Sequence, residues 1–194
     1  MTTARFLVSM VWLLVPLAAF PQASSHNHYA QPQPAAAEPA AQAFSLIKSL
    51  AGEWEGAVKT DMPIAASMDA VPMHVTMRVT SRGNVVVHEF QQANTPLDPD
   101  KYDHPVTMLY LDSGQLNLVH YCDAGNRPHM TGKISPDGKR VEFDFAELSG
   151  SGKYGHMHTA AFTVVDENRH SEDWTFVLPS GKVVQAHFEL RRVK

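Results

Sequence analysis

Apolar and polar residues alternate with a period of two through most of the chain after residue 52. Such alternation is typical of β-strands that bury one face. It predicts ten strands, at about residues 53–60, 72–81, 84–92, 106–111, 115–122, 129–134, 140–147, 156–165, 170–178 and 182–191. Tight-turn sequences separate several of these runs, including Arg-Gly-Asn at 82–84 and Asp-Ser-Gly at 112–114.

Ten consecutive antiparallel strands without helical crossovers predict an all-β fold, a single up-and-down β-barrel. Closure into a barrel removes the exposed strand edges, and a β-sandwich is the main alternative. Ahead of the strands, Phe44, Ile47 and Leu50 have helical spacing. They predict a short N-terminal helix that lies across one end of the barrel.

The N-terminal residues have the composition of an export signal followed by a linker. Arg5 precedes an apolar run over residues 6–20, and small residues follow at 23–24. We therefore expect a signal peptide at 1–23, a disordered Ala/Pro/Gln-rich linker at 24–43 and the barrel domain at 44–194. The apolar run is short for a membrane span, so the mature product is expected to be exported, periplasmic or secreted, without membrane insertion.

Composition narrows the possible partners and chemistry. The net charge of -4 over 194 residues shows no basic excess, so nucleic acid is not an expected partner. A single cysteine excludes an internal disulfide. Common hydrolase, P-loop and dinucleotide-binding motifs are missing from the sequence, so an enzyme of those classes is not expected and enzyme function in general stays open.

The strand at 115–122 and the polar loop after it form the first candidate site. Alternation places His120 and Cys122 at the end of the strand's more apolar face, next to a loop that contains Asn126. Strand directions alternate in a meander, so connections after odd-numbered strands share one end of the barrel. Four of those five connections are long, which predicts that this end is a binding mouth.

A second candidate is the His-x-His pair at 156 and 158, which alternation places on one face with Ala160 and Phe162. Two imidazoles in this spacing can bind one zinc or copper ion. If the lumen brings His156 and His158 close to His120, Asp123 or His129 would complete the ligand shell. Another possible metal site is the expected new terminus, Ser24-Ser25-His26, whose amine, amides and imidazole suit Cu(II). The alternative is that His120 is a hydrogen-bonded core residue.

A short helix, the Gly-x-Trp element at 52–54 and the following meander resemble the calycin group, which includes lipocalins and fatty-acid-binding proteins. The wider pattern, with His-Tyr-Cys at 120–122 and Gly-His-Met-His at 155–158, is similar to exported bacterial calycin-like domains of unknown function. This resemblance implies a barrel fold and no particular reaction. Haem-binding barrels with a histidine on the last strand would nominate His187, but alternation turns His187 away from the apolar face.

The favoured hypothesis is an exported lipocalin-like protein that binds a small amphiphilic or apolar molecule. Its predicted ligand-binding residues are His120, Cys122, Asn126, His156, His158, Phe162 and Trp174. Its predicted interior also includes Met77, Leu118, Phe143, Phe145 and Phe188. One alternative is a zinc- or copper-dependent enzyme or metal-binding protein that uses His120, His156 and His158. Another is a structural domain whose interior is filled by its own side chains.

Overall fold

The computed structural model describes residues 38–62 and 72–194. The predicted signal peptide, most of the predicted linker and the Ser24-Ser25-His26 segment lie outside the described residues. The described elements are α1 (Glu38–Ser49), β1 (Gly52–Thr60), β2 (Met73–Thr80), η2 (Ser81–Gly83), β3 (Val85–Gln92), β4 (Val106–Asp112), β5 (Gln115–Tyr121), β6 (Arg127–Ile134), β7 (Arg140–Ser149), β8 (His156–Asp166), β9 (Arg169–Val177) and β10 (Val183–Arg192).

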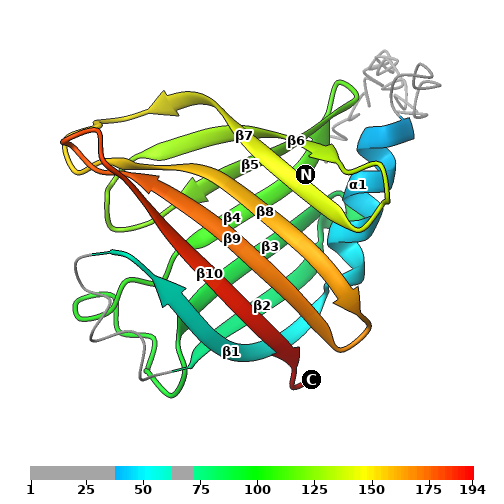
Figure 1. Ribbon diagram of the computed structural model, residues 1–194, viewed down its shortest axis with the longest axis horizontal. Coiled ribbons are helices and arrows are strands. Elements are labelled where there is room, and N and C mark those ends of the chain that lie inside the picture. Colours follow the sequence, from blue (N-terminus) through cyan, green and yellow to red (C-terminus); the bar gives the residue numbers. More distant parts are fainter. Residues whose placement is uncertain (1–37, 63–71) are drawn as a thin grey trace, which may run out of the picture. The chain divides into compact units, whose positions relative to one another are not determined.

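The ten strands form one closed antiparallel barrel in which each strand pairs with its neighbours in sequence (Figure 1). β1 and β10 close the barrel through seven register pairs that run from Trp54 with Arg192 to Thr60 with Ala186. The all-β barrel prediction is confirmed, and the strand bounds agree with it to within a few residues. Closure pairs the backbone groups that a sandwich would leave at its edges.

Side chains fill the middle of the barrel. Met77, Leu118, Phe143, Phe162 and Phe188 are all buried in one hydrophobic cluster, as their alternation predicts. Phe145, also expected inside, is only partly buried. A ligand would therefore have to bind near an end of the barrel, because protein interiors leave few voids larger than a water molecule.

The helix α1 lies at the end of the barrel that carries the short connections and packs against β4, β5, β6 and β7 (Figure 1). It begins at Glu38, six residues before the expected domain start, so the end of the predicted linker is helical. Alanine has the highest helix propensity, and Ala43 is completely buried against the barrel. Phe44 and Ile47 are buried with it, so this helix closes the end opposite the predicted mouth.

Trp54 joins the helix to the two strands that close the barrel. Its indole N–H donates to the carbonyl oxygen of Leu50 at 2.8 Å, and the Arg192 guanidinium lies 4.0 Å from the ring centroid. The ring itself is fully buried and meets His170 edge-on at 4.2 Å. This tryptophan belongs to the Gly-x-Trp element, so that element has a structural role at the closed end.

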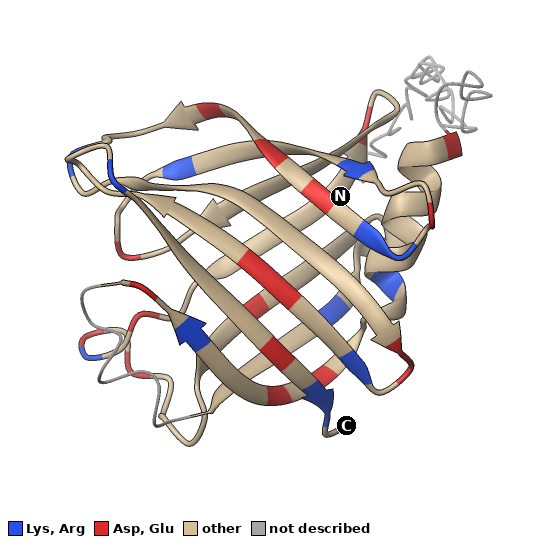
Figure 2. Ribbon diagram, in the orientation of Figure 1, with Lys and Arg blue, Asp and Glu red and all other residues tan. Residues whose placement is uncertain are grey.

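Acidic and basic residues are interspersed over the face of the barrel that Figure 2 shows. Among the described residues of this face, charges of one sign do not gather over several neighbouring strands. Within 38–62 and 72–194, no helix has the length and apolar character needed to cross a membrane.

Candidate functional site

A cavity of about 420 Å³ opens at the end of the barrel opposite α1, where the long connections lie. Its apolar wall consists of Met73, Phe90, Met157, Trp174, Phe176 and Val184. Residues 101–103 of the β3–β4 connection and residues 122–123 after β5 form its rim. The predicted mouth is thus a cavity in the structure, and three of the predicted ligand-binding residues line it: His120, Cys122 and Trp174.

His120 points inward from β5 at the inner wall of this cavity and is completely buried. Its Nδ1 lies 2.8 Å from Oγ1 of Thr107, its register partner on β4, and its Nε2 has no hydrogen-bond partner in the described part of the chain. Burial, together with the nearby His88, lowers the pKa of His120 to about 3. The imidazole is therefore neutral at any physiological pH.

Trp174 forms part of the cavity wall, and its ring is held on several sides. Its centroid lies 5.5 Å from that of His120, 6.1 Å from Phe90 and 5.7 Å from Phe162. Phe162, which the sequence nominates as a ligand-binding residue, is fully buried in the core and does not line the cavity. Its ring instead packs edge-on against Trp174 from the side of the core.

Next to Trp174, the interior of the barrel contains a buried carboxylate that the sequence analysis did not identify. Glu172 is completely buried. It accepts hydrogen bonds from His88 at 3.0 Å, from His170 at 3.0 Å and from the Trp174 indole N–H at 3.0 Å. Burial alone would raise the pKa of Glu172, but His88 and His170 lower it below its usual value. An ionised carboxylate thus fixes Trp174 from inside.

A signal for Glu172 was present in the sequence. Trp174 is a predicted ligand-binding residue, and alternation puts Glu172 and His170 on the same face of its strand. A glutamate on an inward face must be paired, because an unpaired buried charge is too costly. The sequence could not show that one of its partners would be His88, from a strand 84 residues away.

Burial raises the pKa values of the Cys122 thiol and of the Asp103 carboxyl at the rim. Burial raises the pKa of Cys122 to about 11, so the thiol stays protonated. Partial burial and the neighbouring Asp123 raise the pKa of Asp103 to about 6, and the Asp123 backbone N–H donates to the Asp103 carboxylate. A protonated thiol is a poor nucleophile, so the arrangement does not resemble a Cys–His catalytic pair.

Asn126 lies outside the cavity lining and ties two loops together. Its side-chain amide donates to the carbonyl oxygens of Ser151 and Gly155 at 2.9 and 2.7 Å, and the side chain is buried. The structure therefore gives Asn126 a supporting role, in which it holds the β7–β8 connection against the loop after β5.

His156 and His158 lie together but away from His120. Their ring nitrogens approach to 3.3 Å, and both rings pack on Phe145 with centroids 4.9 Å away. The β8–β9 register shifts between Met157 and Thr159, so Met157 lines the cavity and the His-x-His pair does not. This bulge breaks the alternation that placed the two histidines on the face of Ala160 and Phe162.

The structure does not gather the predicted metal ligands around one point. Over residues 38–62 and 72–194, no three His, Cys, Asp or Glu side chains group as an ion would require. His129, a possible fourth ligand, is occupied by Asn117 at 2.8 Å and by Glu147 at 3.6 Å. Zinc or copper at the mouth stays a prediction that this geometry does not support.

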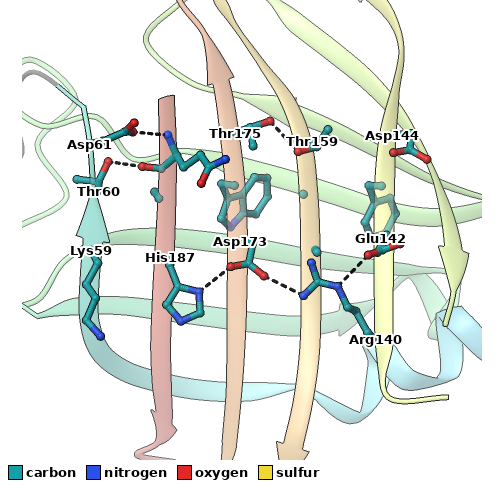
Figure 3. Close-up of a pocket in the computed structure, with 16 residues that line it drawn as sticks. Lys59, Thr60, Asp61, Arg140, Glu142, Asp144, Thr159, Asp173, Thr175 and His187 are labelled. Carbon is teal, nitrogen blue, oxygen red and sulfur yellow. Dashed lines mark hydrogen bonds and ion pairs between the residues drawn. The ribbon is translucent and has the colours of Figure 1, made fainter. Parts of the chain in front are cut away.

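A larger groove of about 800 Å³ runs along the outer wall of β1, β7, β8, β9 and β10 (Figure 3). Asp173 lies at its centre, 2.6 Å from His187 and 2.8 Å from Arg140, and Arg140 also bonds Glu142 at 3.0 Å. These groups bond one another, so the carboxylate at the centre of the groove is already paired on both sides. His187 faces outward here, as its alternation predicts.

Comparisons with known proteins find similar folds and identify no function. No family model matches the chain, and no curated protein matches it. The structure is similar to the crystal structure of Rv2717c from M. tuberculosis, with 14% identity and a TM-score of 0.57 over 78% of this chain and 98% of that one.

It also matches a protein of unknown function of the DUF3598 family from Nostoc punctiforme PCC 73102. That match has 10% identity and a TM-score of 0.46 and covers 76% of this chain and 49% of the other. At such low identity, the likeness to Rv2717c establishes a shared barrel fold and nothing about a ligand.

Proposed function

We propose that the protein is a calycin-like binding protein that takes a small apolar or amphiphilic molecule into the mouth of its barrel. One observation carries this proposal: an apolar cavity of about 420 Å³ has at its inner wall a buried imidazole nitrogen that no described residue hydrogen-bonds. Ligand sites in proteins are typically concave, largely apolar and provided with a few fixed polar groups.

The size and position of the cavity support a ligand smaller than a long lipid. Ligand pockets typically measure roughly 300 to 1,000 Å³, and this cavity lies toward the lower limit. The core cluster around Phe143 and Phe162 fills the barrel beyond it. A bound molecule would therefore lie between the rim at residues 101–103 and Trp174, without entering the lower barrel.

The expected export signal suggests where the protein acts. We propose that binding takes place after removal of residues 1–23, in the periplasm or outside the cell. The N-terminal sequence of the exported protein tests this part of the proposal. A terminus near Ser24 is expected, and recovery of the Met1 peptide would contradict it.

A metal-dependent function has less support than ligand binding. His156 and His158 offer two nitrogens 3.3 Å apart, but Phe145 rather than a third ligand packs against them. A catalytic function is weakened in the same way, because the Cys122 thiol is held protonated.

The binding proposal can be tested with a neutral fluorescent probe, N-phenyl-1-naphthylamine, and a matched pair of alanine variants. Ala186 faces inward and lines the cavity, whereas Ala57 is exposed on the outer face of β1. We expect Ala186→Phe to fill part of the cavity and weaken probe binding by about tenfold or more, equivalent to roughly 1.4 kcal/mol. Ala57→Phe should leave binding unchanged.

Both affinities are measured by titrating the probe and following its emission, with circular dichroism as a check on folding. Equal affinities in the two variants, or no binding to the parent protein, would refute the mouth as a ligand site.

A further inference from the structure

The bond between Thr107 and His120 allows two positions for the ring proton of His120. A neutral imidazole has one N–H donor and one bare nitrogen that accepts. Thr107 Oγ1 lies 2.8 Å from His120 Nδ1, and both side chains are completely buried. Among the described residues, neither Nδ1 nor the hydroxyl has another side-chain or backbone partner.

Each of the two possible arrangements leaves one buried donor unpaired among the described residues. If Nδ1–H donates to Thr107, the unpaired donor is the threonine hydrogen. If the Thr107 hydroxyl donates to Nδ1, the unpaired donor is Nε2–H. His120 lines the cavity and Thr107 does not, so a ligand at the mouth can pair Nε2–H but not the threonine hydrogen. An acceptor on the ligand therefore satisfies every donor only when the proton of His120 is on Nε2.

Covalent geometry directs this N–H toward the barrel axis. Nδ1 adjoins the ring carbon that is attached to the side chain, and it is bonded to the neighbouring strand β4. Nε2 lies at the far side of an inward-pointing ring, next to the aromatic rings of Trp174 and Phe90, which also line the cavity. Phe90 is only partly buried, so a ligand in the cavity can contact its ring beside His120.

We propose that the molecule bound at the mouth is neutral and flat, and that a carbonyl-type oxygen on it accepts the Nε2–H of His120. This inference rests on the proposed function and names its ligand class. Phe90, Trp174 and Phe176 provide aromatic surfaces for a flat molecule. A neutral imidazole does not offset an anion, and the Asp103 and Asp123 carboxyls at the rim disfavour one.

Two planar probes of equal shape test the acceptor directly: 2-acetylnaphthalene, which has a carbonyl oxygen, and 2-isopropenylnaphthalene, which has a CH₂ group in its place. Thr107→Val removes the hydroxyl at constant shape, and Thr107→Ser retains it. The measured quantity is the ratio of the two affinities, from quenching of tryptophan emission. We expect this ratio to fall about fivefold to tenfold in Thr107→Val and to stay near the parent value in Thr107→Ser.

The tautomer has its own readout, separate from affinity. Long-range nitrogen–proton correlation spectra of histidine-labelled protein distinguish protonated from bare ring nitrogens, and His120→Phe assigns the signals. With 2-acetylnaphthalene bound, a proton on Nε2 is expected, and a proton on Nδ1 would overturn the inference. Probes that bind with the same affinity ratio in parent and Thr107→Val would also overturn it while leaving the binding function intact. Failure of both naphthalenes to bind would refute the binding function itself.

Discussion

Three imidazoles inside the barrel each use one ring nitrogen and leave the other without a partner in the described part of the chain. The unpartnered atoms are Nδ1 of His88, Nε2 of His120 and Nδ1 of His170. Each buried polar atom of this kind costs about 1–3 kcal/mol relative to a hydrogen-bonded one. His88 and His170 both bond Glu172, and stabilisation of this buried carboxylate compensates for the unpartnered nitrogen of each ring. Among the described residues, His120 bonds only Thr107, and a bound ligand would supply the missing partner of its Nε2.

The lowered pKa of His120 makes stability depend on pH. In the folded protein this pKa is about 3, against an ordinary value of 6.5. The unfolded chain therefore binds more protons between these values, and the free energy of unfolding falls as pH is lowered through that window. The slope that His120 contributes approaches about 1.4 kcal/mol for each pH unit. The raised pKa of Asp103, about 6, acts in the opposite direction between pH 3.8 and 6.

Urea unfolding of the parent and of His120→Phe between pH 5 and 6.5 separates these effects, because Asp103 is present in both proteins. We expect a shallower loss of stability on acidification in His120→Phe. Identical pH slopes in the parent and His120→Phe would mean that the buried imidazole titrates as it does in water.

At the scale of elements, the strands were predictable and their irregularities were not. Alternating residues and turn sequences placed all ten strands, because both signals are local. The bulge in β8 between Met157 and Thr159 has no turn residue to mark it, so the His-x-His pair was assigned to the wrong face. The start of α1 was missed for a related reason, since Ala and Pro near residue 38 also suit a linker.

Substitutions on the inward face of β9 should lower stability more than substitutions on its outward face. Glu172 is fully buried with three donors, whereas the adjacent Asp173 faces outward and is about 40% exposed. Removing one partner of a buried ionic group typically costs about 3–5 kcal/mol, and an exposed pair contributes less than about 1 kcal/mol.

We therefore expect Glu172→Ala to lose several times more stability than Asp173→Ala in urea unfolding. Glu172→Ala should also alter Trp174 emission, because the indole N–H loses its acceptor. Comparable losses in the two variants would show that the buried carboxylate does not hold the core together.

At the scale of the whole molecule, the barrel has a closed end, a filled middle and an open mouth. The helix α1 packs at one end, the core cluster occupies the centre, and the cavity lies at the other end. The direction of each strand follows from its order in the chain, so the sequence alone identified the mouth. It could not identify which side chains meet across the lumen, such as Glu172 with His88, because no local pattern encodes a contact between distant strands.

The most direct test of ligand binding at the mouth uses the methionine methyl groups as reporters. Met62, Met73 and Met157 line the cavity, whereas Met77 and Met130 lie in the filled core. Protein labelled with ¹³C at these methyl groups is titrated with N-phenyl-1-naphthylamine and followed by NMR. We predict shifts concentrated on the three cavity methionines, with contacts from probe protons to Met73 and Met157. Shifts confined to the core methionines, or spread evenly over all of them, would contradict binding at the mouth.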